Sequence, residues 1–240
     1  MTLRKLIPNL VSSMNLICGL IGVMFAIRSR LDLAFYWMLA AAACDFLDGW
    51  VARKLNAVSA LGKELDSLCD LVSFGVLPGL MLSFLMQMLR YCNDILTWTP
   101  LFFLGYAAAM RLARFNTDPR QQESFLGLPV PASALLCGAL SCFCCFTPTG
   151  FVTTWAAGWA FLPLLAFLLA VLQVSSIPMF SLKFHRGDDR TVRIKRWTLL
   201  GFVLVSVVFC VVFKHHWSLA VVLTLLFYIL NNLVYALFKL

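Results

Sequence analysis

Residues 45–70 read DFLDGWVARKLNAVSALGKELDSLCD, and five of the chain's 11 acidic residues fall within these 26 positions. Asp45 and Asp48 are three residues apart, and Asp66 and Asp70 are four residues apart. Residues at these spacings share one face of a helix. Because the intervening segment LNAVSALG can turn the chain back, we expect two helix ends that point four carboxylates into one pocket.

The segments on both sides of this stretch are apolar enough to enter a bilayer, since FYWMLAAAAC precedes it and LVSFGVLPGLMLSFL follows it. Unpaired carboxylates in such surroundings repel one another and cost several kcal/mol each in lost hydration. Protonation, buried arginine partners or divalent cations would relieve this cost. Carboxylate oxygens suit Mg²⁺, Mn²⁺ or Ca²⁺. The alternative is that the acidic residues lie at solvated helix ends and bind nothing.

The composition of the whole chain is typical of a polytopic membrane protein. Of its 240 residues, 62% are hydrophobic and 12% are charged, and the mean hydropathy is +0.89. Soluble domains carry about 25% charged residues. The formal net charge of +8 fits contact with an anionic membrane surface. Because the basic residues flank apolar segments, we expect no nucleic-acid binding.

We predict an all-α integral membrane protein with about eight transmembrane helices, because about 20 apolar residues suffice to cross a bilayer. The predicted spans are 8–27, 33–53, 66–89, 95–115, 129–147, 152–173, 197–213 and 217–238. With the N-terminus in the cytoplasm, four of the 19 basic residues lie on the far side, namely Arg28, Arg30, Arg90 and Lys214. The other 15 lie on the cytoplasmic side, as the positive-inside rule requires. This topology puts both termini and the aspartates at the cytoplasmic face.

One long polar segment, HRGDDRTVRIKR, separates the first six predicted spans from the last two. We therefore expect a membrane core at 1–183, a basic cytoplasmic linker at 184–196 and a C-terminal helix pair at 197–240. The six-helix core carries all the motifs. The C-terminal pair is expected to act as a scaffold, a lipid-facing addition or an oligomer surface.

The aspartates belong to a longer pattern, Asp45-x2-Asp48-Gly49-x2-Ala52-Arg53-x8-Gly62-x3-Asp66-x3-Asp70. This pattern resembles the full signature of the CDP-alcohol phosphotransferases and departs from it at no fixed position. The resemblance implies that the first three aspartates are ligands of two divalent cations, Mg²⁺ or Mn²⁺. It implies that Asp70 lies near these cations and is also the general base. A homodimer is implied as well.

The same resemblance implies that Gly49, Arg53 and Ser59 contact the CDP moiety. On physical grounds, Gly49 permits close approach by a base or phosphate, although tight helix packing would also explain a glycine here. Arg53 can pair with phosphate through two hydrogen bonds, although it could instead be an ordinary charge of the inner membrane surface.

Four further stretches resemble the phosphatidylserine synthase branch of this family over roughly residues 4–183. They are PNLVSSMNLICG at 8–19, LCDLVSFGVLPG at 68–79, MRLARFN at 110–116 and FLGLPVPA at 125–132. The first of these carries Asn9 and Asn15. Asn15 lies inside an apolar span, where it predicts either a hydrogen-bonding role at the site or a contact between helices.

A serine acceptor would need a cation for its carboxylate, and Arg111 and Arg114 are three residues apart on one helix face. Ser73 and Asn116 could complete a small polar pocket. Both arginines could equally be inner-surface charges. Glycerol-3-phosphate or an inositol phosphate would also require arginines, so charge alone does not select serine.

The resemblance implies an enzyme that transfers the phosphatidyl group from CDP-diacylglycerol to L-serine, releasing phosphatidylserine and CMP. The serine hydroxyl would attack the phosphorus in line, assisted by Asp70 and two divalent cations. We expect the protein in a bacterial inner membrane. Another acceptor within the family is the nearest alternative, and a non-enzymatic cation-binding protein or transporter that uses the four carboxylates is a more remote one.

Overall fold

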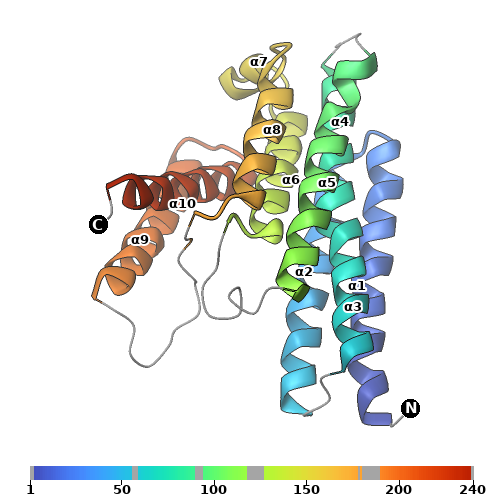
Figure 1. Cartoon of the computed structure of the whole chain (residues 1–240). Helices are drawn as coiled ribbons and strands as arrows, with labels where there is room; N and C mark the ends of the chain where they lie inside the picture. The colour runs from blue at the N-terminus through green and yellow to red at the C-terminus, as the bar shows by residue number, and fades with distance from the viewer. Residues whose placement is uncertain are drawn as a thin grey trace.

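The structure, a computed structural model, describes residues 3–55, 59–89, 94–117, 127–177, 179 and 190–238, and within these ranges it contains helices and no strand (Figure 1). The elements are α1 (Leu3–Ile27), α2 (Leu31–Lys54), α3 (Ala60–Asp70), the π-helical segment η1 (Leu71–Val76), α4 (Leu77–Met88), α5 (Asp94–Thr117), α6 (Val130–Phe146), α7 (Phe151–Ala156), α8 (Phe161–Val174), α9 (Arg190–Val212) and α10 (Ser218–Phe238). The all-helical prediction is confirmed.

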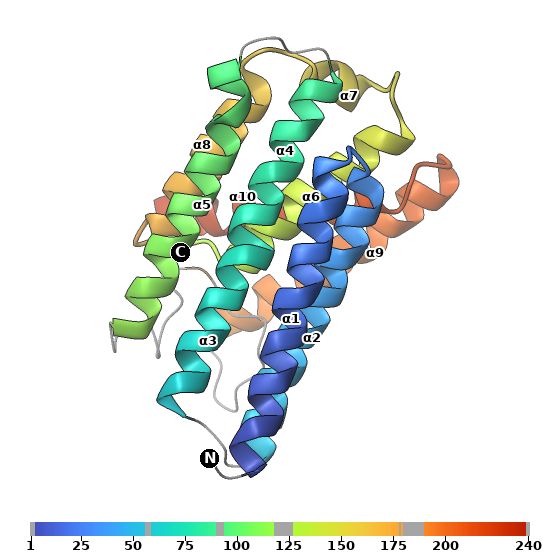
Figure 2. The same ribbon diagram turned by 90° about the vertical axis from the view of Figure 1, so that its right-hand side faces the viewer.

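Helices α1 and α2 form an antiparallel pair, and α3, η1 and α4 continue one another as a single rod beside it (Figure 2). Helices α5, α6 and α8 pack around this rod and complete the bundle. The end of α2 and the start of α3 lie at one end of the bundle, and the α1–α2 turn lies toward the other (Figure 1). The residues of the two aspartate pairs therefore lie in the half of the bundle that contains the α2–α3 turn.

Five helical stretches are long and apolar enough to cross a membrane, and they are Ile7–Ile27, Ala60–Met88, Ile95–Thr117, Arg193–Val212 and Ser218–Leu237. Two further apolar helices, α6 and α8, are shorter. Helix α2 has 24 residues but is not among the five, because its aspartates lower its mean hydropathy. The structure supports a polytopic membrane protein, whereas the predicted count of eight spans is not confirmed.

The span predicted over 152–173 is wrong as a single helix. Helix α7 ends at Ala156 and α8 begins at Phe161, so the chain is interrupted around Gly158. Glycine destabilises a helix interior by about 1 kcal/mol relative to alanine. Pro163 lies in the first turn of α8, where its missing N–H costs no helical hydrogen bond. These two residues favour a new helix start over continuation.

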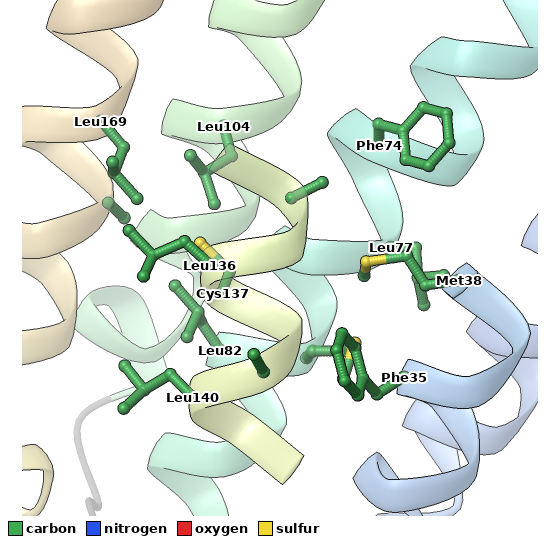
Figure 3. Packing of buried hydrophobic residues seen from close by; sticks show 14 of the residues in the cluster. Phe35, Met38, Phe74, Leu77, Leu82, Leu104, Leu136, Cys137, Leu140 and Leu169 are labelled. Atoms are coloured by element: carbon green, nitrogen blue, oxygen red, sulfur yellow. The ribbon is translucent and has the colours of Figure 1, made fainter. Parts of the chain in front are cut away.

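Helix α6 supplies much of the bundle's core. A Cβ added to Gly138 would lie 2.6 Å from the ring of Phe35, so α6 approaches α2 more closely than any larger residue would allow. One hydrophobic cluster contains Leu136, Cys137 and Leu140 of α6 (Figure 3). It also contains Phe35 of α2, Phe74 of η1 and Leu77 of α4. This packing fixes the spacing between the α1–α2 pair and the rod that follows it.

The C-terminal pair docks on this core through α10, which packs against both α6 and α9. Trp217, just before α10, stacks on Phe35 with ring centroids 5.7 Å apart. His216 stacks on Phe146 at 4.1 Å. Helix α9 begins at Arg190, so the predicted linker is helical from that residue onward, while 184–189 lie outside the described residues.

The turn that reverses the chain at the aspartates is shorter than the segment LNAVSALG. Helix α2 ends at Lys54, and α3 already begins at Ala60. Ser59 is the N-cap of α3, and its Oγ accepts a hydrogen bond of 3.0 Å from the backbone N–H of Gly62. Gly62 thus lies in the first turn of α3, and the cap determines where the second carboxylate helix begins.

Candidate functional site

Three of the four predicted aspartates form one cluster. Oxygen atoms of Asp45, Asp48 and Asp66 all lie within 4.8 Å of one another. Asp45 and Asp48 come from the last turns of α2, and Asp66 comes from the middle of α3. Asp48 is buried, and the other two are partly buried. The spacing along each helix places the carboxylates of α2 on one helix face and those of α3 on another. The reversal of the chain between α2 and the capped start of α3 brings these two faces together.

Helix α1 provides hydrogen-bond donors to two carboxylates of the site. The hydroxyl of Ser12 donates to Oδ2 of Asp48 over 2.6 Å, and Nδ2 of Asn15 donates to Oδ1 of Asp70 over 3.0 Å. The hydrogen-bonding role and the helix contact predicted as alternatives for Asn15 are therefore both present in one interaction. Ser12 was not among the predicted site residues, although it lies at a spacing of three from both Asn9 and Asn15 and so shares their helix face.

A first cavity, of about 230 Å³, lies between α1, α2 and α3. Gly49, Arg53 and Ser59, the residues predicted to contact CDP, all line it, and so does Asn9. A Cβ added to Gly49 would meet only Nη2 of Arg53, at 4.0 Å. No neighbouring helix packs on Gly49 among the described residues, so helix packing does not explain this glycine, and the space beside it is open to a ligand.

A second cavity, of about 410 Å³, adjoins the first and shares Asp48 and Asp66 with it. Its polar lining comes from α2, α3 and the C-terminal part of α5, and comprises Asp45, Asp48, Arg53, Lys63, Asp66, Ser67, Asp70, Arg111 and Asn116. The first turn of α6, with its proline at position 131, forms another part of the wall. The carboxylate cluster thus lies at the junction of two cavities.

Three buried atoms in the wall of the second cavity have no hydrogen-bond partner among the described residues. They are Oδ1 of Asp66, Nε of Arg111 and Oδ1 of Asn116. Arg111 is only 7% exposed. Buried polar atoms are almost always paired in folded proteins. Two acceptors and one donor left open around one cavity are what a small polar ligand or a cation would complete.

The other residues predicted to bind serine lie elsewhere. Ser73 is fully buried in η1, and its hydroxyl donates to the backbone oxygen of Asn15 over 3.2 Å. Arg114 is exposed, and its Nη1 donates to the backbone oxygen of Val174 over 2.9 Å. Neither residue is among those that line the two cavities. Arg111 and Asn116 do line the second cavity, so the structure separates the predicted set into two groups.

Lys63 contributes to both cavities, although nothing in the sequence separated it from the other basic residues. Its Nζ donates to the backbone oxygen of Asn116 over 3.3 Å, which connects the start of α3 to the end of α5. The amide of Asn116 in turn donates to Ser67 Oγ over 2.9 Å. These bonds connect α3 to the end of α5 beside the second cavity.

The donor set of the cluster fits a divalent cation. Three carboxylates whose oxygens lie within 4.8 Å of one another offer the hard oxygen ligands that Mg²⁺, Mn²⁺ and Ca²⁺ prefer. The unpartnered Oδ1 of Asp66 is a buried acceptor that a cation would satisfy. Asp70 lies outside the group of three but lines the same cavity. The cluster can therefore hold a metal ion while Asp70 remains beside it.

Fold and site together define an integral membrane protein whose helical bundle holds, between two cavities, a carboxylate cluster suited to a divalent cation. The chain belongs to the CDP-alcohol phosphatidyltransferase family, whose sequence pattern matches residues 5–182. This match covers the helices that build the site, and it confirms the family resemblance of the aspartate signature.

Several individual proteins are similar in sequence to this chain. The archaetidylserine synthase of Methanothermobacter thermautotrophicus is 34% identical over 173 residues, covering 71% of this chain and 68% of the relative. The CDP-diacylglycerol–serine O-phosphatidyltransferase of Bacillus subtilis is 35% identical over 143 residues, covering 56% and 75%. The enzyme of the same name from Mycobacterium tuberculosis is 33% identical over 182 residues, covering 73% and 61%. The names of all three relatives refer to serine.

Proposed function

We propose that this protein transfers the phosphatidyl group from CDP-diacylglycerol to L-serine, giving phosphatidylserine and CMP. The observation that carries the proposal is the junction of two cavities at Asp48 and Asp66. The residues assigned to CDP all line the first cavity, and Gly49 and Arg53 also line the second. Asp70 and Arg111 line the second cavity alone. The serine in the names of the three relatives supports this acceptor.

The donor occupies the first cavity in this proposal. Gly49 leaves room for the nucleotide, and Arg53 faces its phosphates with a guanidinium group suited to two parallel hydrogen bonds. Phe46 and Trp50 of α2 are 69% and 47% exposed, on the helix that carries this wall. These exposed aromatic side chains suit the acyl chains of a donor that enters from the bilayer.

Serine binds in the second cavity, with its carboxylate at Arg111 and its ammonium group near Oδ1 of Asn116. Each group has an atom without a hydrogen-bond partner among the described residues, so serine would complete them rather than compete with existing bonds. The serine hydroxyl then faces Asp70. Any contribution of Ser73 and Arg114 to serine binding would be indirect, because neither residue lines the cavity.

The reaction is an in-line displacement at the phosphorus atom that joins the lipid to CMP. Asp70 takes the hydroxyl proton as the serine oxygen forms its bond to phosphorus. The bond between that phosphorus and the CMP oxygen breaks, and CMP departs with the electron pair. Two divalent cations, Mg²⁺ or Mn²⁺, held by Asp45, Asp48, Asp66 and Asp70, would stabilise negative charge on the phosphates.

We place the site at the cytoplasmic face of a bacterial inner membrane, with both termini on that side. The distribution of Lys and Arg supports this orientation. The catalytic core extends over 1–183, followed by the linker 184–196 and the pair 197–240, and two chains form a homodimer. Labelling of single cysteines introduced at Arg28 and Lys54 in intact cells tests the sidedness, because only the first should react with an impermeant reagent.

CMP release by the purified, detergent-solubilised protein tests the proposed function. The assay contains CDP-diacylglycerol and Mn²⁺ or Mg²⁺, with serine, glycerol-3-phosphate or an inositol phosphate added separately. We expect release with serine and its loss in Asp70→Asn. Release with another acceptor alone would keep the family and overturn serine. If folded, metal-loaded protein releases no CMP with any acceptor, the enzymatic proposal is wrong.

A further inference from the structure

We propose that Ser12 is a positioning residue that holds Asp48 in the orientation needed to bind a divalent cation. This inference rests on the proposed function, because it assumes that the carboxylate cluster binds a metal ion. Ser12 belongs to α1, whereas every carboxylate of the cluster belongs to α2 or α3. The metal site would thus depend on a helix that contributes no ligand to it.

The contact between the two side chains is short, and both residues are buried. Oγ of Ser12 lies 2.6 Å from Oδ2 of Asp48, and the two residues are 4% and 5% exposed. Distances of 2.5–2.7 Å are typical of a hydroxyl that donates to an ionised carboxylate. The backbone oxygen of Pro8, the other acceptor near this hydroxyl, is farther away at 3.2 Å. Because a hydroxyl has one proton, the shorter bond to Asp48 takes it.

This bond restrains a carboxylate that its neighbours repel. Three carboxylates whose oxygens lie within 4.8 Å favour rotamers that turn away from one another when no cation is bound. A donor from α1 holds one oxygen of Asp48 and limits rotation of the group, and the remaining lone pairs stay available to a cation. Partners of this kind, which hydrogen-bond to metal ligands, typically contribute about 10- to 100-fold to metal affinity.

The neighbouring serine offers a natural comparison. The hydroxyl of Ser13 donates to the backbone oxygen of Asn9 over 2.8 Å, within its own helix. Ser12 and Ser13 therefore have the same chemistry and adjacent positions, but only Ser12 bonds to a carboxylate across two helices. One turn farther along α1, Asn15 bonds to Asp70 in the same way. Helix α1 thus touches the site from one face.

The experiment measures Mn²⁺ binding directly, by electron paramagnetic resonance titration of metal-free protein in detergent, for wild type, Ser12→Ala, Ser12→Thr and Ser13→Ala. We expect the dissociation constant for Mn²⁺ to rise about 10-fold or more in Ser12→Ala. Ser12→Thr, which keeps the hydroxyl, and Ser13→Ala should stay within about threefold of wild type.

Two results would overturn the inference. The first is wild-type Mn²⁺ affinity in Ser12→Ala, and a raised KM for CDP-diacylglycerol in the same variant would then make Ser12 a nucleotide contact. The second is an equal loss of affinity in Ser12→Ala and Ser13→Ala, which would indicate a general packing effect. If wild type itself binds no Mn²⁺, the metal site of the proposed function fails instead.

Discussion

Nδ2 of Asn15 on α1 donates to Oδ1 of Asp70 across 3.0 Å, and so connects the first helix to the last residue of α3. Asn15 is fully buried, and the π-helical segment η1 begins directly after Asp70. Segments of π-helix often mark functional sites. The orientation of the proposed general base therefore depends on a residue 55 positions earlier in the chain.

Replacing Asn15 by leucine should lower kcat for CMP release about 10-fold or more. The change removes a hydrogen bond to a charged group, which is worth about 1.5–3 kcal/mol, and a tenfold rate change corresponds to about 1.4 kcal/mol. The rate is measured at saturating CDP-diacylglycerol and serine. Ser13→Ala is the control on the same helix. A kcat for Asn15→Leu within twofold of wild type would contradict the role given to this bond.

Asp66→Asn should abolish detectable Mn²⁺ binding and lower CMP release by about 100-fold or more, because the cluster loses the ligand with an open, buried oxygen. Treatment of wild type with a chelator should have the same effect, reversed by Mn²⁺ or Mg²⁺. Asp32→Asn is the matched control. Asp32 pairs with Arg30 at 3.3 Å at the far end of α2, and a surface pair of this kind contributes little. Equal losses in both variants would argue against a metal role for Asp66.

Arg111→Lys should raise the KM for serine about 10-fold, while the KM for CDP-diacylglycerol stays near the wild-type value. A lysine keeps the charge but loses the planar, paired donors that match a carboxylate. Arg114→Lys should have a smaller effect on the KM for serine, because the Arg114 guanidinium is exposed and already donates to Val174. Steady-state kinetics with each substrate varied separately measures both constants. An unchanged KM for serine in Arg111→Lys would remove Arg111 from the acceptor site.

Gly49→Ala should weaken donor binding without destabilising the protein. The added methyl group meets only Arg53 Nη2, at 4.0 Å, and alanine favours a helix by about 1 kcal/mol over glycine. The methyl group instead occupies space in both cavities, and displacement of a substrate by about 1 Å can cost up to about 100-fold in rate. We expect a KM for CDP-diacylglycerol raised about 10-fold and an unchanged thermal midpoint. A drop in thermal midpoint with normal kinetics would point to helix packing.

Gly79→Ala should have the opposite pattern, with a lower thermal midpoint and little direct effect on substrate KM values. A Cβ at this position would lie 2.7 Å from the backbone Cα of Leu101, so α4 and α5 would have to separate. Overpacking of this kind costs about 1–3 kcal/mol. Gly105→Ala on α5 is the control, because among the described residues no atom outside its own stretch of helix lies within 4 Å of the added Cβ. Thermal unfolding in detergent compares the two, and equal midpoints would contradict close packing at Gly79.

Sequence alone determined the class of protein and the identity of the carboxylates. Apolar composition excludes a soluble fold, and the spacing of Asp45, Asp48 and Asp66 places them on helix faces because helical periodicity is a local property. The eight-residue signature was sufficient to identify the family. The interruption of 152–173 was missed, because Gly158 and Pro163 weaken a helix without a change in hydropathy.

Tertiary structure decided which polar residues join the carboxylates. Arg111 and Arg114 look alike in sequence, but only Arg111 lines the second cavity. Ser12 and Ser13 are also alike in sequence, yet only Ser12 reaches Asp48. Such choices depend on how α1 and α5 are rotated and how closely they approach α2 and α3. Packing between helices sets the rotation and the distance of approach, and no spacing within one helix encodes them. One example is Gly19 of α1, whose missing side chain leaves room for Ser73.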